Sequence, residues 1–175
     1  MTDMKRTDLK PNEFNEYYER YIQKLTDTIE LIESFEYGKQ KVMEFFNSIP
    51  EEKLNYRYEP KKSSIMDVLQ HLIDTERVFM YRCLRIARND STPLAGFDQN
   101  EYIVPSGASK KTKDELLNEF KINRENSVAL LKSLSDENLK FIGNASGSDL
   151  SARAAAFIIP GHDIWHMEVI KESYL

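Results

Sequence analysis

The sequence is poor in several residue types, and each shortage excludes a class of protein. One cysteine, Cys83, in 175 residues excludes an intrachain disulfide and a cysteine-rich zinc site, and it fits a reducing compartment. No stretch approaches the roughly 20 apolar residues that a membrane span needs. The first twelve residues have no apolar core of the kind found in signal peptides. We therefore expect a cytoplasmic protein with no membrane partner.

The chain also lacks a contiguous block of basic residues. Lysine and arginine number 24 against 29 aspartates and glutamates, which gives a net charge of −5. A nucleic-acid backbone is therefore excluded as an expected partner. The length and the 41% share of apolar residues suit one globular domain. We predict a flexible tail over residues 1–13 and a single domain over residues 14–175.

Glycine and proline are scarce, with six of each, and the alternation typical of strands is almost absent. Helical spacing predicts a short N-terminal helix that starts near Phe14. It also predicts four long helices: one opened by a capping box at Asp27–Glu30 and ended by Pro50, one from Ser63 or Ser64 to about Arg88, one from Thr112 to about Leu134, and one from Leu150 to Glu172. Residues 90–111 lack this spacing and form a long connection. The predicted fold class is all-α, a four-helix bundle.

The three histidines are placed so that one site can contain all of them. His162 and His166 are four residues apart, so they share the apolar face of the last helix. His71 lies at the edge of the apolar arc of the second long helix. Three imidazoles from facing helices leave coordination positions open for water and substrate, as in catalytic metal sites. The alternative is that they are hydrogen-bonded core residues or stacked side chains.

Two further features stand out near these histidines. Glu76 falls among apolar residues, where a carboxylate needs a partner, and Arg153 on the last helix is the favoured candidate. Pro160 and Gly161 directly precede His162. We predict a kink at Pro160 that aims His162, and close approach of backbone or ligand at Gly161. The alternative is a shorter helix that begins at Pro160.

Three stretches resemble the DinB/YfiT-like superfamily: residues 64–77, 92–102 and 161–166. Each is loose alone, but one histidine on the second helix with H-x-x-x-H on the last is specific in combination. The resemblance extends from about Tyr17 to Leu175. It implies an up-down-down-up bundle with a long crossover between helices 2 and 3. Ser63 is a departure, because relatives often carry tryptophan there.

The same resemblance implies a divalent metal, nickel or zinc, held by His71, His162 and His166. Our leading hypothesis is a metal-dependent enzyme that transfers a low-molecular-weight thiol, bound as a cofactor, to an electrophilic small-molecule substrate. One alternative is a hydrolase that uses metal-bound water. Another is a non-catalytic metal-binding bundle, with its tyrosine-rich N-terminal segment as the surface of a homodimer.

Other polar residues are candidates for supporting roles. We expect the loop around Phe97 to Tyr102 to border the pocket. The candidates for orienting the ligands or moving protons are Asp67, Glu76 and Asp163. The candidates for contact with substrate are Arg82, Asp98 and Tyr102.

Overall fold

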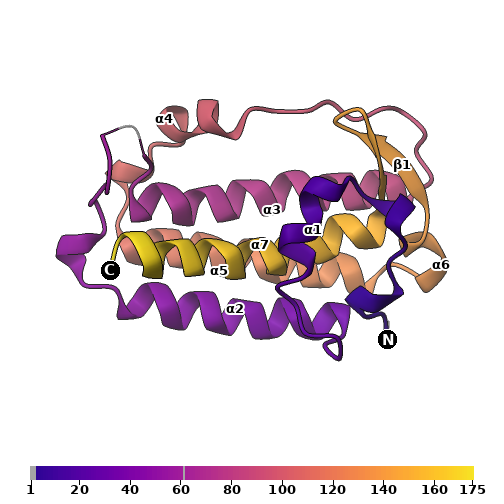
Figure 1. Ribbon diagram of the computed structural model, residues 1–175, viewed down its shortest axis with the longest axis horizontal. Coiled ribbons are helices and arrows are strands. Elements are labelled where there is room, and N and C mark those ends of the chain that lie inside the picture. Colours follow the sequence, from indigo (N-terminus) through magenta and orange to yellow (C-terminus); the bar gives the residue numbers. More distant parts are fainter. Residues whose placement is uncertain (1–2, 61) are drawn as a thin grey trace.

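Four long helices form the molecule in the computed structural model, which describes residues 3–60 and 62–175. They are α2 (Leu31–Ser48), α3 (Ile65–Ala87), α5 (Lys113–Lys132) and α7 (Ala152–Ser173). Figure 1 shows α2 and α7 running in one direction and α3 and α5 in the opposite direction. The predicted four-helix bundle of up-down-down-up topology is therefore confirmed.

Short elements precede and connect the long helices. They are the 3₁₀ helices η1 (Arg6–Asp8), η2 (Pro11–Glu13), η3 (Glu16–Tyr18), η4 (Glu51–Lys53), η5 (Gln99–Tyr102) and η6 (Ala108–Lys110), the single turns α1 (Glu19–Ile22), α4 (Ile103–Ser106) and α6 (Asp136–Leu139), and the strands β1 (Ile142–Ala145) and β2 (Ser148–Ser151). The long crossover runs between α3 and α5 along the outside of the bundle (Figure 1). Among the described helices, none is both long and apolar enough for a membrane span.

Side-chain caps determine where the long helices begin. The Ser64 and Thr112 side chains accept hydrogen bonds from backbone N–H groups at the starts of α3 and α5, as the sequence predicts. The predicted capping box at Asp27–Glu30 is wrong, because the N-cap of α2 is Glu30, three residues after Asp27. The Leu31 N–H donates to the Met4 carbonyl at 2.9 Å, so the N-terminal segment sets this boundary.

Residues 3–13 lie against the bundle, whereas the sequence predicts a flexible tail over residues 1–13. Met4 and Glu13 are buried in this segment. Arg153 of α7 donates to the Glu13 carboxylate at 2.8 Å and to the Asp8 carbonyl at 2.9 Å. This segment therefore joins the bundle through one buried ion pair and a backbone contact. Residues 1 and 2 lie outside the described residues.

A β-hairpin directly precedes the last helix and takes up the first two residues that the sequence assigns to that helix. β1 pairs with β2 in antiparallel register, with Ile142 opposite Ser151. The two turn residues, Ser146 and Gly147, have φ values of 54° and 78°, as the tight turns of hairpins require. As a result α7 begins at Ala152, two residues later than predicted, with the Ser151 hydroxyl as its cap.

The last helix is continuous across Pro160, which excludes the alternative of a shorter helix that begins there. Next to it, Gly161 is where the N-terminal segment crosses the helix. A Cβ atom on Gly161 would lie 2.1 Å from the carbonyl oxygen of Tyr21, so only glycine allows this approach. The close approach predicted at Gly161 is therefore made by backbone.

Candidate metal centre

The three histidines of the chain meet between α3 and α7. Nε2 of His162 lies 3.1 Å from Nε2 of His71 and 3.0 Å from Nε2 of His166. All three ligand atoms lie within 4.8 Å of one another. His162 is only 4% exposed, and the other two are half-buried. The structure thus brings together all three residues that the sequence singles out as ligands.

The two distances from His162 fit ligands that share one ion. Two nitrogens at about 2.0–2.1 Å from a metal, at an angle of about 90–110°, lie about 2.9–3.4 Å apart. Hydrogen bonds alone fit the arrangement less well. Nε2 of His162 is close to two other nitrogens, whereas in a neutral imidazole this atom has either one N–H to donate or one lone pair to accept with. The other ring nitrogen of His71, Nδ1, lies 3.3 Å from the Thr75 hydroxyl. This contact orients the ring so that Nε2 faces the other histidines.

The electrostatics keep the three rings uncharged. Burial lowers the pKa of His71 to about 4 and, together with the nearby His71 ring, lowers the pKa of His166 to about 3. Burial and the two neighbouring histidines lower the pKa of His162 well below its ordinary value. All three rings are therefore neutral at pH 7, which is the form that binds metal ions.

An aromatic wall holds the α7 histidines in place. The Tyr21 ring lies edge-on to His162 and to Trp165, with centroids 5.1 and 5.7 Å apart, and Trp165 lies edge-on to His166 at 4.8 Å. The sequence indicates Tyr21 only as part of a short amphipathic helix. The missed signal is Gly161, where α7 accepts the backbone that carries Tyr21.

Glu76 pairs with Arg124 of α5, so the predicted partner, Arg153, is wrong. Arg124 Nε donates to both carboxylate oxygens of Glu76, at 2.9 and 3.0 Å, and Nη2 donates to Asp163 at 2.6 Å. Glu76, Arg124 and Asp163, the buried charge cluster, are each 1% exposed or less. Arg153 instead binds Glu13. The sequence does contain a signal that Arg124 is buried, because it lies four residues after Phe120 on the apolar stripe of its helix.

The cluster links the two helices that carry the histidines. Glu76 lies on α3 and Asp163 on α7, and both bind the same guanidinium from α5. The hydrogen bonds of both carboxylates within the described residues go to Arg124. The carboxylate of the third candidate, Asp67, accepts a hydrogen bond from the Ser64 backbone N–H at 2.8 Å and binds Arg57 at 2.6 Å. The structure therefore gives all three acids contacts that hold helices in place.

Comparison with known proteins supports the architecture. Residues 34–170 match the sequence model of the DinB superfamily, which is well over half of the chain. The chain belongs to the DinB superfamily. A solved structure with a similar fold is YfiT from Bacillus subtilis, described as a probable metal-dependent hydrolase with an unusual four-helix bundle topology. It is 15% identical, with a TM-score of 0.72, over 94% of this chain and 89% of YfiT. No curated protein gives a significant match.

In this DinB bundle a cavity of about 430 Å³ opens beside His162. Arg82 and Asp98 line it, together with Thr75 and the tyrosines at positions 17, 18 and 21. Tyr102 instead borders a smaller space of about 10 Å³ beside His71. Two of the three residues expected at the pocket, Arg82 and Asp98, therefore share a cavity with His162, and Tyr102 lies in the space beside His71.

Arg82 holds the wall of this DinB cavity together. Its Nη2 donates to the Ala95 carbonyl at 3.1 Å and to the Ser146 hydroxyl at 2.8 Å, which joins the crossover to the hairpin. Its guanidinium also lies over the Phe97 ring, 5.6 Å from the centroid. Both hydrogen bonds come from Nη2 and join two segments of the wall, so Arg82 shapes the cavity.

Proposed function

We propose that this protein is a divalent-metal-dependent enzyme that acts on a small molecule, with nickel or zinc held by His71, His162 and His166. The convergence of three neutral imidazoles on one point between α3 and α7 is the observation that carries this proposal. When bound, such an ion lowers the pKa of a water or thiol that coordinates it, so that a strong nucleophile is available near neutral pH.

Residues of the chain itself would bind the substrate, orient the histidines and limit the access of water. The 430 Å³ cavity is of ligand size, and its wall combines tyrosine rings with polar groups such as Asp98 and Asn100. The Thr75 hydroxyl, at 3.3 Å from His71 Nδ1, keeps that ring oriented. The segment around Tyr21 covers His162 and limits access of water from that side.

Hydrolysis is the reaction that we place first. The description of YfiT as a probable metal-dependent hydrolase, in a protein of the same fold, supports the same reaction class.

Transfer of a low-molecular-weight thiol is the second candidate. The chain's only cysteine, Cys83, is fully buried, and burial raises the pKa of its thiol to about 12. It is therefore an inert core residue. A thiol nucleophile would have to come from a bound cofactor, and the cavity beside His162 is large enough for one.

Metal analysis of the purified protein tests the ligand set. We expect one divalent ion per chain in the wild type, and loss of stoichiometric binding in His71→Ala, His162→Ala and His166→Ala. Arg77→Ala is the matched control, because Arg77 is exposed on α3 and pairs with Glu119. Folded wild-type protein that binds neither nickel nor zinc would contradict the proposal.

Turnover assays separate the reactions. A panel of esters and amides, and a panel of thiols with monochlorobimane, would be incubated with the metal-loaded protein with and without a chelator. Chelator-sensitive hydrolysis supports the first candidate, and chelator-sensitive thiol transfer supports the second. If the loaded protein does neither, the non-catalytic metal-binding alternative is correct.

A further inference from the structure

A groove of about 500 Å³ runs between α2 and α7, away from the histidines. Its apolar lining comes from both helices and from the connector before α2, namely Leu25, Ile29, Phe45, Pro160, Ile164 and Met167. It shares no lining residue with the two cavities beside the histidines. Its volume lies within the range of small-molecule sites, and its lining is as apolar as theirs.

The base of the groove is a fixed part of the bundle. The two helices are in close contact at Gly38 and Pro160, because a Cβ atom on Gly38 would lie 3.9 Å from Cβ of Pro160. The same Cβ atom would lie 3.2 Å from Arg124 Nη1. Directly beneath, Asp163 is bound by Arg124, so the carboxylate at the base is already paired. The groove is thus built on the buried charge cluster.

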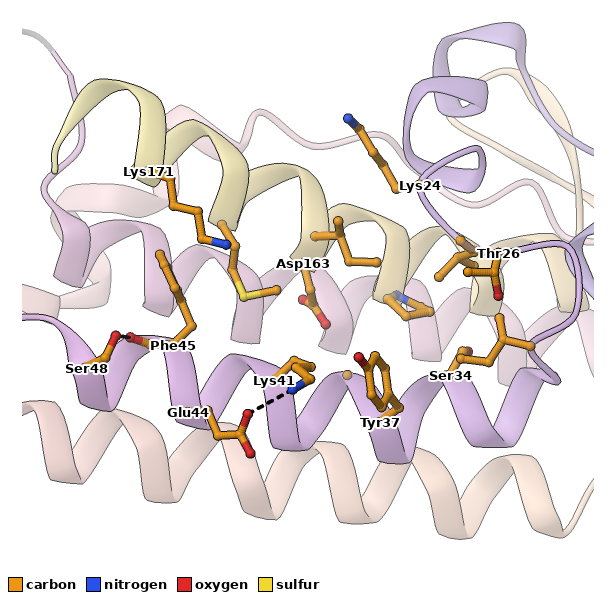
Figure 2. A pocket seen from close by; sticks show the side chains of 16 residues that line it. Lys24, Thr26, Ser34, Tyr37, Lys41, Glu44, Phe45, Ser48, Asp163 and Lys171 are labelled. Atoms are coloured by element: carbon orange, nitrogen blue, oxygen red, sulfur yellow. Dashed lines mark hydrogen bonds and ion pairs between the residues drawn. The ribbon is translucent and has the colours of Figure 1, made fainter.

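The rim carries a surplus of positive charge. Three lysines and one glutamate line it, in a chain whose net charge is −5. Lys24 pairs with Glu168, and Lys41 pairs with Glu44 at 3.1 Å. Lys171 forms no ion pair within residues 3–60 and 62–175, and its Nζ lies 5.4 Å from the centroid of the Phe45 ring. Figure 2 shows the Lys171 side chain extending along the groove above Phe45.

We propose that this groove binds a free amphipathic anion, a single carboxylate on an apolar chain. The carboxylate pairs with Lys171 near Phe45, and the chain extends over Met167 and Ile164 toward Leu25. An unpaired ammonium beside an apolar surface is what such a ligand requires. A second copy of the chain fits less well, because a two-fold contact would place this lysine-rich rim against itself.

Calorimetric titration of the full chain with dodecanoate, below its micellar concentration and with a chelator present, tests the proposal. We expect saturable 1:1 binding that is at least about tenfold tighter than binding of dodecyltrimethylammonium or dodecanol. The chelator makes the result independent of the metal centre, so failure of the proposed function would leave it unchanged.

Variants at exposed positions locate the site. Lys171→Gln should weaken dodecanoate binding about fivefold. Lys121→Gln, which also removes one positive charge but at an exposed position on α5, should leave the affinity for dodecanoate unchanged. Thr26→Trp, at the Leu25 end of the groove, should shorten the longest carboxylate that binds (Figure 2).

Four results would overturn the proposal. The first three are absence of saturable binding, equal affinity for the three dodecyl probes, and unchanged affinity in Lys171→Gln. A dimer in sedimentation velocity that Tyr37→Arg dissociates would also overturn it, since the groove would then belong to a second copy. Tyr37 is 54% exposed on the rim, so this substitution leaves the core intact.

Discussion

At the residue scale, Glu13 shows what an ion pair with an arginine does to a buried carboxylate. Burial alone would raise its pKa. Hydrogen bonds from Arg153, from the Ser151 hydroxyl and from the Lys10 backbone outweigh burial, so the pKa of Glu13 lies below its ordinary value of 4.5. The ionised form is therefore the one that holds the N-terminal segment on α7.

Glu13→Gln should lower the free energy of unfolding at pH 7 by about 3 kcal/mol, because it leaves Arg153 buried without a counter-ion. The folded-state pKa of Glu13 is depressed, so its contribution is fully present above pH 4.5 and is lost as the pH falls through the lower folded value. Urea unfolding of both proteins from pH 7 to pH 3 measures this. A difference that stays constant over the range would contradict the assignment.

At the element scale, the buried charge cluster fixes how α3, α5 and α7 lie relative to one another. Arg124 is the only cation in contact with the Glu76 and Asp163 carboxylates among the described ion pairs. Removing it leaves two carboxylates without a partner, whereas replacing all three residues by apolar ones removes every desolvated charge.

Arg124→Met should therefore destabilise the bundle by about 3–5 kcal/mol, whereas the triple variant Glu76→Leu, Arg124→Met, Asp163→Leu should be near the wild type in stability. Urea unfolding measures both. If the triple variant is as unstable as the single one, the cluster contributes specific stabilisation that apolar packing cannot replace. Metal titration of a stable triple variant would then show how far the cluster itself sets the spacing of the imidazoles.

The helices were predictable because their signals are local. Ser64 and Thr112 are caps whose partners lie three residues away, and the apolar stripes repeat every three or four residues. The start of α2 was not predictable, because Leu31 is held by Met4, far away in the chain. The hairpin has strands of four residues, too short for a periodic signal, and Leu150 continues the helical spacing of α7.

The candidate site divides in the same way. The pair His162 and His166 follows from helix geometry alone, and His71 from the apolar arc of its own helix. The partners of Glu76 and Arg153 do not follow from the sequence, because each ion pair depends on which elements pack against each other in the folded bundle. A charge in an apolar stripe shows that a partner exists, and only the packed bundle shows that the partner of Glu76 is Arg124.

At the scale of the whole molecule, the proposed metal binds across helices far apart in the chain and should therefore stabilise the entire fold. At a free metal concentration of 100 times the Kd, the free energy of unfolding should rise by about 2.7 kcal/mol if the unfolded chain does not bind metal. Chemical unfolding with and without nickel or zinc measures this. His166→Ala should abolish the gain, and a gain that survives this substitution would place the metal elsewhere.

The arrangement of α7 has a consequence for the order of events during synthesis. This helix follows the other three in the chain, yet it carries two of the three imidazoles. It is also the surface onto which the earliest described residues fold, through Gly161 and Arg153. A nascent chain that lacks α7 therefore has neither the proposed metal centre nor the surface on which its own N-terminal segment packs. Formation of the proposed centre and docking of that segment thus both follow translation of α7.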